Sequence, residues 1–121
     1  MRLGAILSTH KHNDHCGHND QFAENFPNLK IYGGVHDKVK CATDEMEDGD
    51  EFKVEEDIHV RTIHTPCHTS GHVIFHVDKK VVFVGDTVFV GGCGRFFEGT
   101  PADMLNSLKK FAKLPDDTLV Y

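Results

Sequence analysis

The sequence predicts an α/β fold in which a mixed β-sheet is flanked by helices. Residues 3–7 and 81–84 are apolar at both odd and even positions, which is typical of strands buried on both faces. Residues 19–26 instead place their apolar side chains at helical spacing, and Pro27 follows as a stop signal. Strand, loop and helix recur along 121 residues, a length that suits at most one domain.

The middle of the chain predicts further strands. Residues 29–32 alternate as a strand, residues 36–39 suggest a short helical turn, and the acidic residues 44–50 indicate a solvated loop. Residues 57–65 are rich in Ile, Val and Thr, which favours a strand. Val73, Phe75 and Val77 alternate with the polar residues His72, His76 and Asp78, so we expect a half-exposed strand there.

The last predicted helix has a clear start signal. Thr100 suits the N-cap, Pro101 the first helical position, and Asp103 the positive end of the helix dipole. Pro115 ends the helical stretch, and residues 118–121 begin another strand. The apolar stripe of this helix predicts core packing. Its members are Met104, Leu105, Leu108, Phe111 and Ala112.

Composition limits the classes of function. The formal net charge is −6, which argues against a surface that must neutralise nucleic-acid phosphates. No apolar run reaches the length of a membrane span, and no targeting segment is visible, so we expect a cytoplasmic protein, with mitochondria as the alternative. Four widely spaced cysteines without a CxxC pair favour reduced thiols inside a cell over a disulfide framework.

Histidine is in excess, and one short stretch concentrates it with a carboxylate. His10, His12, Asp14 and His15 fall within six positions of a chain that has ten histidines. His10 and His12 should point the same way, because side chains alternate in an extended segment. Asp14 and His15 follow where the chain begins to turn, so they can serve a second point in space. The stretch therefore predicts a platform for two adjacent metals.

Two later loops carry further candidate ligands. His68 lies in a loop rich in Pro and Gly, and Asp86 stands at the carboxyl end of a predicted buried strand. Each loop follows a β segment, so all can meet at one edge of a sheet. Imidazole and carboxylate groups are zinc ligands, and Asp86 is the natural bridge between two metals. A turn or cap role is the alternative for Asp86.

The remaining histidines have other expected roles. His72 could orient a neighbouring ligand through a hydrogen bond. We expect the other five to be surface or hydrogen-bonded polar residues. They are His18, His36, His59, His64 and His76.

Four stretches resemble the hydroxyacylglutathione hydrolases (glyoxalase II) of the metallo-β-lactamase superfamily: STHKHNDHCGHN, TPCHTSGH, GDTVFVGGCGRFFEG and LPDDTLVY. HxHxDH alone specifies only the superfamily, while the second and third stretches narrow the resemblance to this family. The resemblance implies an αββα sandwich and a thioester hydrolase that acts in methylglyoxal detoxification. Its substrate would be a small glutathione thioester, S-D-lactoylglutathione, cleaved to D-lactate and glutathione by a metal-activated water.

The resemblance also implies a set of site residues. His10, His12 and His68 would hold one metal, Asp14 and His15 the other, and Asp86 would bridge them. Asp14 and Asp86 would also be catalytic, because they orient the attacking water. The expected cofactor is zinc, two ions per complete site, with iron or manganese as alternatives.

Two residues of the glycine-rich loop would contact the substrate. Arg95 takes the family's basic position beside the glutathione moiety. Phe97 takes a position that is Tyr in some members, so any hydrogen bond from that hydroxyl is absent.

The family pattern also extends past both ends of this chain. A further histidine for the second metal comes from a GHEY-type motif after the LVY strand, whereas this chain ends at Tyr121. We therefore expect residues 1–121 to form a partial metallo-β-lactamase-like domain without the C-terminal glutathione-binding helical region. The sequence does not set the oligomeric state.

Three alternatives stay open. A glutathione persulfide dioxygenase with one iron would use His10, His68 and Asp86 as a facial triad. A truncated, non-catalytic chain would bind metal weakly or pack against a partner through exposed sheet edges. A nuclease of the same superfamily is disfavoured by the acidic charge and the glutathione-type loop.

Overall fold

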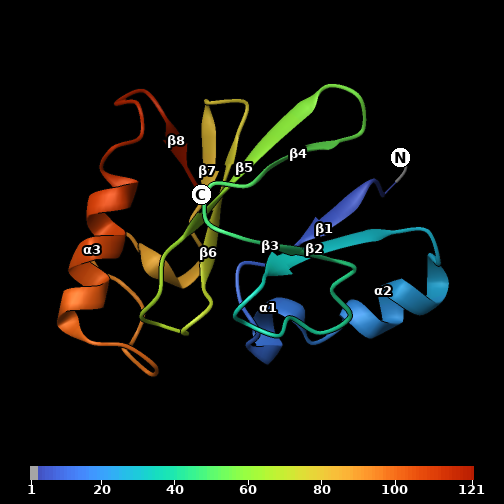
Figure 1. The fold of residues 1–121 in the computed structure, drawn as a ribbon, viewed down its shortest axis with the longest axis horizontal. Helices are drawn as coiled ribbons and strands as arrows, with labels where there is room; N and C mark the ends of the chain where they lie inside the picture. Colours follow the sequence, from blue (N-terminus) through green and yellow to red (C-terminus); the bar gives the residue numbers. More distant parts are fainter. Residues whose placement is uncertain (1–2) are drawn as a thin grey trace.

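A computed structural model describes residues 3–121 as two facing β-sheets with helices on their outer sides (Figure 1). The first sheet is parallel, in the order β1 (Ala5–Leu7), β2 (Lys30–Gly34), β3 (Asp44–Met46). The second has the order β4 (Glu51–Val54), β5 (Ile58–His64), β6 (Val73–Val77), β7 (Val81–Phe83), β8 (Leu119–Val120). It is antiparallel except between β7 and β8. The predicted α/β class with a mixed sheet is confirmed.

The helices lie on the two outer sides (Figure 1). The short α1 (Asn13–Cys16) and α2 (Asn19–Asn25) flank the first sheet, and α3 (Pro101–Phe111) flanks the second. A single 3₁₀ turn, Gly85–Thr87, follows β7. Within residues 3–121, no helix combines the length and apolar character needed to cross a membrane.

Strand β6 is the centre of the core. Val73 and Phe75 face the first sheet, where Leu7 packs against them. Ile74 faces the opposite side of the sheet and packs with Val82. Phe111 of α3 packs against this cluster. Residues 73–77 were predicted to be half exposed, and this was wrong, because α3 covers the face that the alternation assigned to solvent.

Four other local predictions were also wrong, and one strand was not predicted. The acidic segment begins with strand β3, because Asp44–Met46 pairs with β2. Residues 36–39 form turns without a helix, and β4 was not predicted. Phe83 at the end of β7 is 46% exposed and Leu105 on α3 is 53% exposed. Both were expected in the core, and neither belongs to it.

The start of α3 agrees with the sequence. The Thr100 hydroxyl accepts a hydrogen bond from the Asp103 N–H, and the Asp103 carboxylate accepts one from the Thr100 N–H at 2.8 Å. This capping box satisfies two backbone donors at the helix end. It fixes where the preceding loop, which faces the candidate site, joins α3.

We expect Ile74→Ala to lower the free energy of unfolding by about 2–5 kcal/mol, because it leaves a cavity at a fully buried position. Urea denaturation measures this loss. The matched control is Leu105→Ala on the exposed side of α3, for which we expect a change within about 0.5 kcal/mol. Equal losses in the two variants would contradict this assignment of the core.

Candidate metal centre

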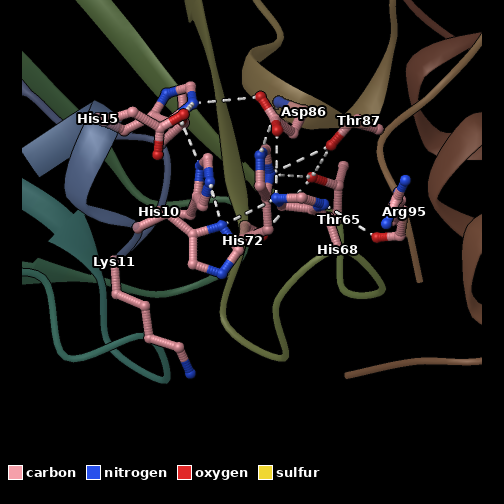
Figure 2. Close-up of polar contacts among 12 residues, drawn as sticks. His10, Lys11, His15, Thr65, His68, His72, Asp86, Thr87 and Arg95 are labelled. Atoms are coloured by element: carbon pink, nitrogen blue, oxygen red, sulfur yellow. Dashed lines mark hydrogen bonds and ion pairs between the residues drawn. The ribbon is translucent and has the colours of Figure 1, made fainter. Parts of the chain in front are cut away.

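The candidate ligands meet at one end of the two sheets (Figure 2). The loop after β1, including α1, carries His10, His12 and His15. The loop between β5 and β6 carries His68, and the 3₁₀ turn after β7 carries Asp86. These five side chains form two groups in which the ligand atoms lie within 4.8 Å of one another. The gathering predicted from the three loops is therefore what the structure has.

Three imidazole nitrogens form the first group. His10 Nε2 lies 3.0 Å from His12 Nδ1, which lies 2.9 Å from His68 Nε2. His68 Nδ1 donates to the Arg95 carbonyl oxygen at 2.9 Å, and its Nε2 faces the group. One backbone carbonyl thus sets the orientation of His68.

His10 is neutral at physiological pH. Its side chain is fully buried, and burial, followed by the nearby His15 and His68, lowers its pKa to about 3. His10 therefore keeps one ring nitrogen free of a proton. Three imidazole nitrogens at this spacing are a donor set that zinc and related metals prefer, so the residues fit a metal ion.

Asp86 lies between the first group and a second one formed by His10, His15 and Asp86 itself. Its Oδ1 is 3.2 Å from His15 Nε2, and its Oδ2 is 3.1 Å from His68 Nε2 (Figure 2). Each carboxylate oxygen thus faces a different histidine. This is the placement that a bridging carboxylate requires.

Asp14 lies at the rim of this arrangement. Its side chain is 79% exposed, and its Oδ2 is 3.5 Å from His15 Nε2. It belongs to neither ligand group among residues 3–121. Its position in the first turn of α1 directs it towards solvent. The predicted ligand and catalytic roles of Asp14 stay predictions.

His72 is a buried neighbour of the ligand groups that contacts both His10 and Asp86. Its ring is fully buried and stacks on His10 with ring centres 4.8 Å apart. Its Nε2 accepts the Asp86 backbone N–H at 3.1 Å, and its Nδ1 lies 3.1 Å from the hydroxyls of Thr65 and Thr87 (Figure 2). Burial, followed by the nearby His10, lowers its pKa to about 2, so the ring stays neutral. This geometry matches the orienting role expected for His72.

Sequence reasoning missed an ion pair that joins the ligand loops. Lys11 Nζ lies 2.7 Å from Glu98 Oε1, and Glu98 Oε2 accepts the Ser70 N–H at 2.8 Å. The Lys11 N–H donates to the fully buried Asp37 at 2.6 Å. These contacts connect residues 26 to 87 positions apart in the chain, and no local pattern signals them.

The glycine-rich loop lies against the metal groups. The Gly94 N–H donates to the Asp86 carbonyl at 2.8 Å, and a Cβ on Gly94 would lie 2.7 Å from His68 Nδ1, so this approach requires glycine. The Phe97 ring lies 5.7 Å from that of His12 and 5.2 Å from that of His68. The Arg95 side chain is exposed. Both predicted substrate contacts therefore belong to the loop that borders the metal groups.

A family model described as the metallo-beta-lactamase superfamily matches residues 2–121. The chain belongs to this superfamily. It is 47% identical over 126 residues to the cytoplasmic hydroxyacylglutathione hydrolase of Arabidopsis thaliana, covering 99% of this chain and 49% of the relative. It is 44% identical to the hydroxyacylglutathione hydrolase of Aeromonas salmonicida, and the match covers 100% of this chain and 47% of that relative. The predicted resemblance to hydroxyacylglutathione hydrolases is confirmed, over about half the length of these relatives.

Solved structures agree with this superfamily fold. ETHE1 from Myxococcus xanthus has a TM-score of 0.88 and 31% identity, over 100% of this chain and 53% of its own. The BLEG-1 B3 metallo-β-lactamase has a TM-score of 0.82 and 26% identity, over 96% of this chain and 66% of that protein. The metallo-β-lactamase-type architecture is thus confirmed, and a metal cofactor accords with both the superfamily and the His-rich groups.

The Lys11–Glu98 pair predicts a pH-dependent contribution to stability. Hydrogen bonds from Lys11 and Ser70 lower the pKa of Glu98 from 4.5 to about 2. A lowered carboxyl pKa stabilises the fold above pH 4.5, and the contribution disappears as the pH falls towards 2. Glu98→Gln should therefore destabilise the chelator-treated protein at pH 7 and have progressively less effect between pH 4.5 and 2.

Urea denaturation from pH 7 downwards measures this difference. Glu24→Gln is the control, because Glu24 is an exposed glutamate on α2, away from the loops. The wild type and Glu98→Gln should differ less in free energy of unfolding as the pH falls. A difference that stays constant down to the acid end of the range would show that the ion pair does not supply this stability.

Proposed function

We propose that this chain carries the metal-binding part of a hydroxyacylglutathione hydrolase and cleaves glutathione thioesters, with S-D-lactoylglutathione as the substrate. One observation carries the proposal. His10, His12, His68, His15 and Asp86 converge in a chain that is 47% identical to a relative named for this activity. Because the same Arabidopsis relative is named as a cytoplasmic enzyme, we also propose a cytoplasmic location for this chain.

The proposed cofactor is a pair of zinc ions. His10, His12 and His68 would hold one, Asp14 and His15 the other, and Asp86 would bridge them. Bound there, zinc would lower the pKa of a water molecule towards neutrality and polarise the thioester carbonyl. Imidazole and carboxylate donors suit zinc, and the low pKa of His10 keeps its donor available.

The protein's own groups would position the reactants. Asp86 would accept a hydrogen bond from the attacking water, and its backbone is held by the hydrogen bond from the Asp86 N–H to His72 Nε2. Phe97 borders His12 and His68, so its ring would form an apolar edge beside the bound substrate. The leaving thiolate has a conjugate acid with a pKa of roughly 8.5, so its departure requires no strong general acid.

Substrate recognition would fall to the glycine-rich loop. The exposed Arg95 carries a permanent charge suited to the carboxylates of glutathione. Its carbonyl accepts the hydrogen bond from His68, so the substrate contact and the ligand orientation belong to one residue. Movement of this loop would therefore affect both substrate binding and metal geometry.

A thioesterase assay tests the function. The zinc-loaded chain should release free thiol from S-D-lactoylglutathione, and His10→Ala or Asp86→Ala should lower kcat by at least about a hundredfold. His36→Ala, an exposed histidine outside the ligand groups, should keep wild-type turnover. Full turnover in Asp86→Ala would refute the mechanism. Oxygen consumption with glutathione persulfide, dependent on iron, would instead favour the dioxygenase alternative.

The two halves of the site should differ in affinity for zinc. The first has three imidazole nitrogens and Asp86, whereas the second relies on the exposed His15 and Asp14 beside the shared Asp86. Calorimetric titration should show one site about tenfold or more tighter than the other. His12→Ala should remove the tight site, and His15→Ala only the weak one. Two equally tight sites would contradict this ranking.

A further inference from the structure

A cavity lies away from the metal centre, towards the β6–β7 turn. It holds about 540 Å³ between strands β4 to β6 and the segment after α3. Its charged and imidazole side chains are His59, Arg61, His76, Lys79 and Lys113, with the acids Glu51 and Asp78. We call it the outer-face cavity. Its volume falls in the range of small-molecule sites.

His76 is the unusual member of this cavity. Its side chain is only 5% exposed, and its Nε2 has no hydrogen-bond partner among the described residues. The expectation that His76 is a surface or hydrogen-bonded residue was therefore wrong. Burial, followed by the charges of Arg61 and Lys79, lowers its pKa and keeps it neutral. A buried polar atom without a partner is costly, and a ligand that pairs with this ring would offset that cost.

The cations around His76 lack carboxylate partners. Within residues 3–121, no carboxylate lies within 4.0 Å of the charged groups of Arg61, Lys79 or Lys113. Four other lysines do have such partners. These are Lys11, Lys30, Lys40 and Lys110.

The two acids of the cavity are placed differently. Glu51 stands opposite Arg61 in the strand register without forming an ion pair. Asp78 uses its Oδ1 to accept the His59 N–H at 2.9 Å. Three permanent positive charges therefore face two negative ones at this cavity, in a chain whose net charge is −6. Such a local excess of cations attracts an anion.

We propose that the outer-face cavity binds a small organic oxyanion, a carboxylate or a phosphate. Arg61 and His76 stand opposite each other on β5 and β6, so a single anionic group can meet both. The guanidinium offers two parallel donors to such a group, and the neutral imidazole offers one N–H. Lys79 and Lys113 add positive charge at the cavity. A nucleic acid is a poor fit, because the two acids and the overall charge would repel its backbone.

NMR of the zinc-loaded chain tests the site. The imidazole C–H signals of His76, assigned by their loss in His76→Gln, are followed during titration with inorganic phosphate and separately with succinate. Saturable shifts in the millimolar range with either anion support the site, and the tighter of the two identifies the preferred group. Sodium chloride at matched ionic strength should leave the signals unshifted. Shifts that follow ionic strength alone would overturn the proposal.

Charge variants then identify the residues. Arg61→Gln should weaken binding by on the order of tenfold. Lys79→Gln and Lys113→Gln replace exposed side chains, and each should weaken binding by a smaller factor while the fold is retained. Lys109→Gln, an exposed lysine of α3 outside the cavity, should titrate like the wild type. Unchanged affinity in both Lys79→Gln and Lys113→Gln would also overturn the site.

Discussion

The close approach of three imidazole nitrogens is the constraint on which the site depends. His12 Nδ1 lies 3.0 Å from His10 Nε2 and 2.9 Å from His68 Nε2, and contacts from several loops must hold the three rings in these positions. Hydrogen bonds and an ion pair around the site supply this support. Arg95 holds His68, His72 holds the Asp86 backbone, and Lys11 joins two loops through Glu98. Preorganisation of this kind reduces the ordering cost of binding a metal.

The sandwich explains why the loops stay in place. Strand β6 is buried between the first sheet and α3, and it leads directly from His72 into the core. Thr65 and Thr87 come from different loops and meet at His72, where their hydroxyls lie 2.9 Å apart. The ligand loops are thus attached to a strand buried on both faces, and the opening of such a strand costs more free energy than the fraying of a loop.

The gathering of most candidate ligands was predictable because its signal is local, whereas the contacts that support them were not. The short spacing within HxHxDH brings His10, His12 and His15 together but leaves Asp14 exposed, and the loops around His68 and Asp86 follow recognisable strands. The pairing of Lys11 with Glu98 and the burial of His76 instead depend on segments that meet only in the folded chain. Strand β3 was missed for the same reason, since Asp44–Met46 is a strand only because β2 lies beside it.

The two halves of the metal centre differ in what surrounds them. The His12 and His68 half is bordered by Phe97 and by the Arg95 carbonyl. The His15 half opens onto a cavity of about 400 Å³ whose walls include Leu7, Phe83 and Tyr121. A shared carboxylate joins these halves, because each Asp86 oxygen faces a different histidine. An ion held in one half would therefore change the charge that the shared carboxylate offers to the other, so the proposed second ion would bind with an affinity set by the first as well as by the local ligands.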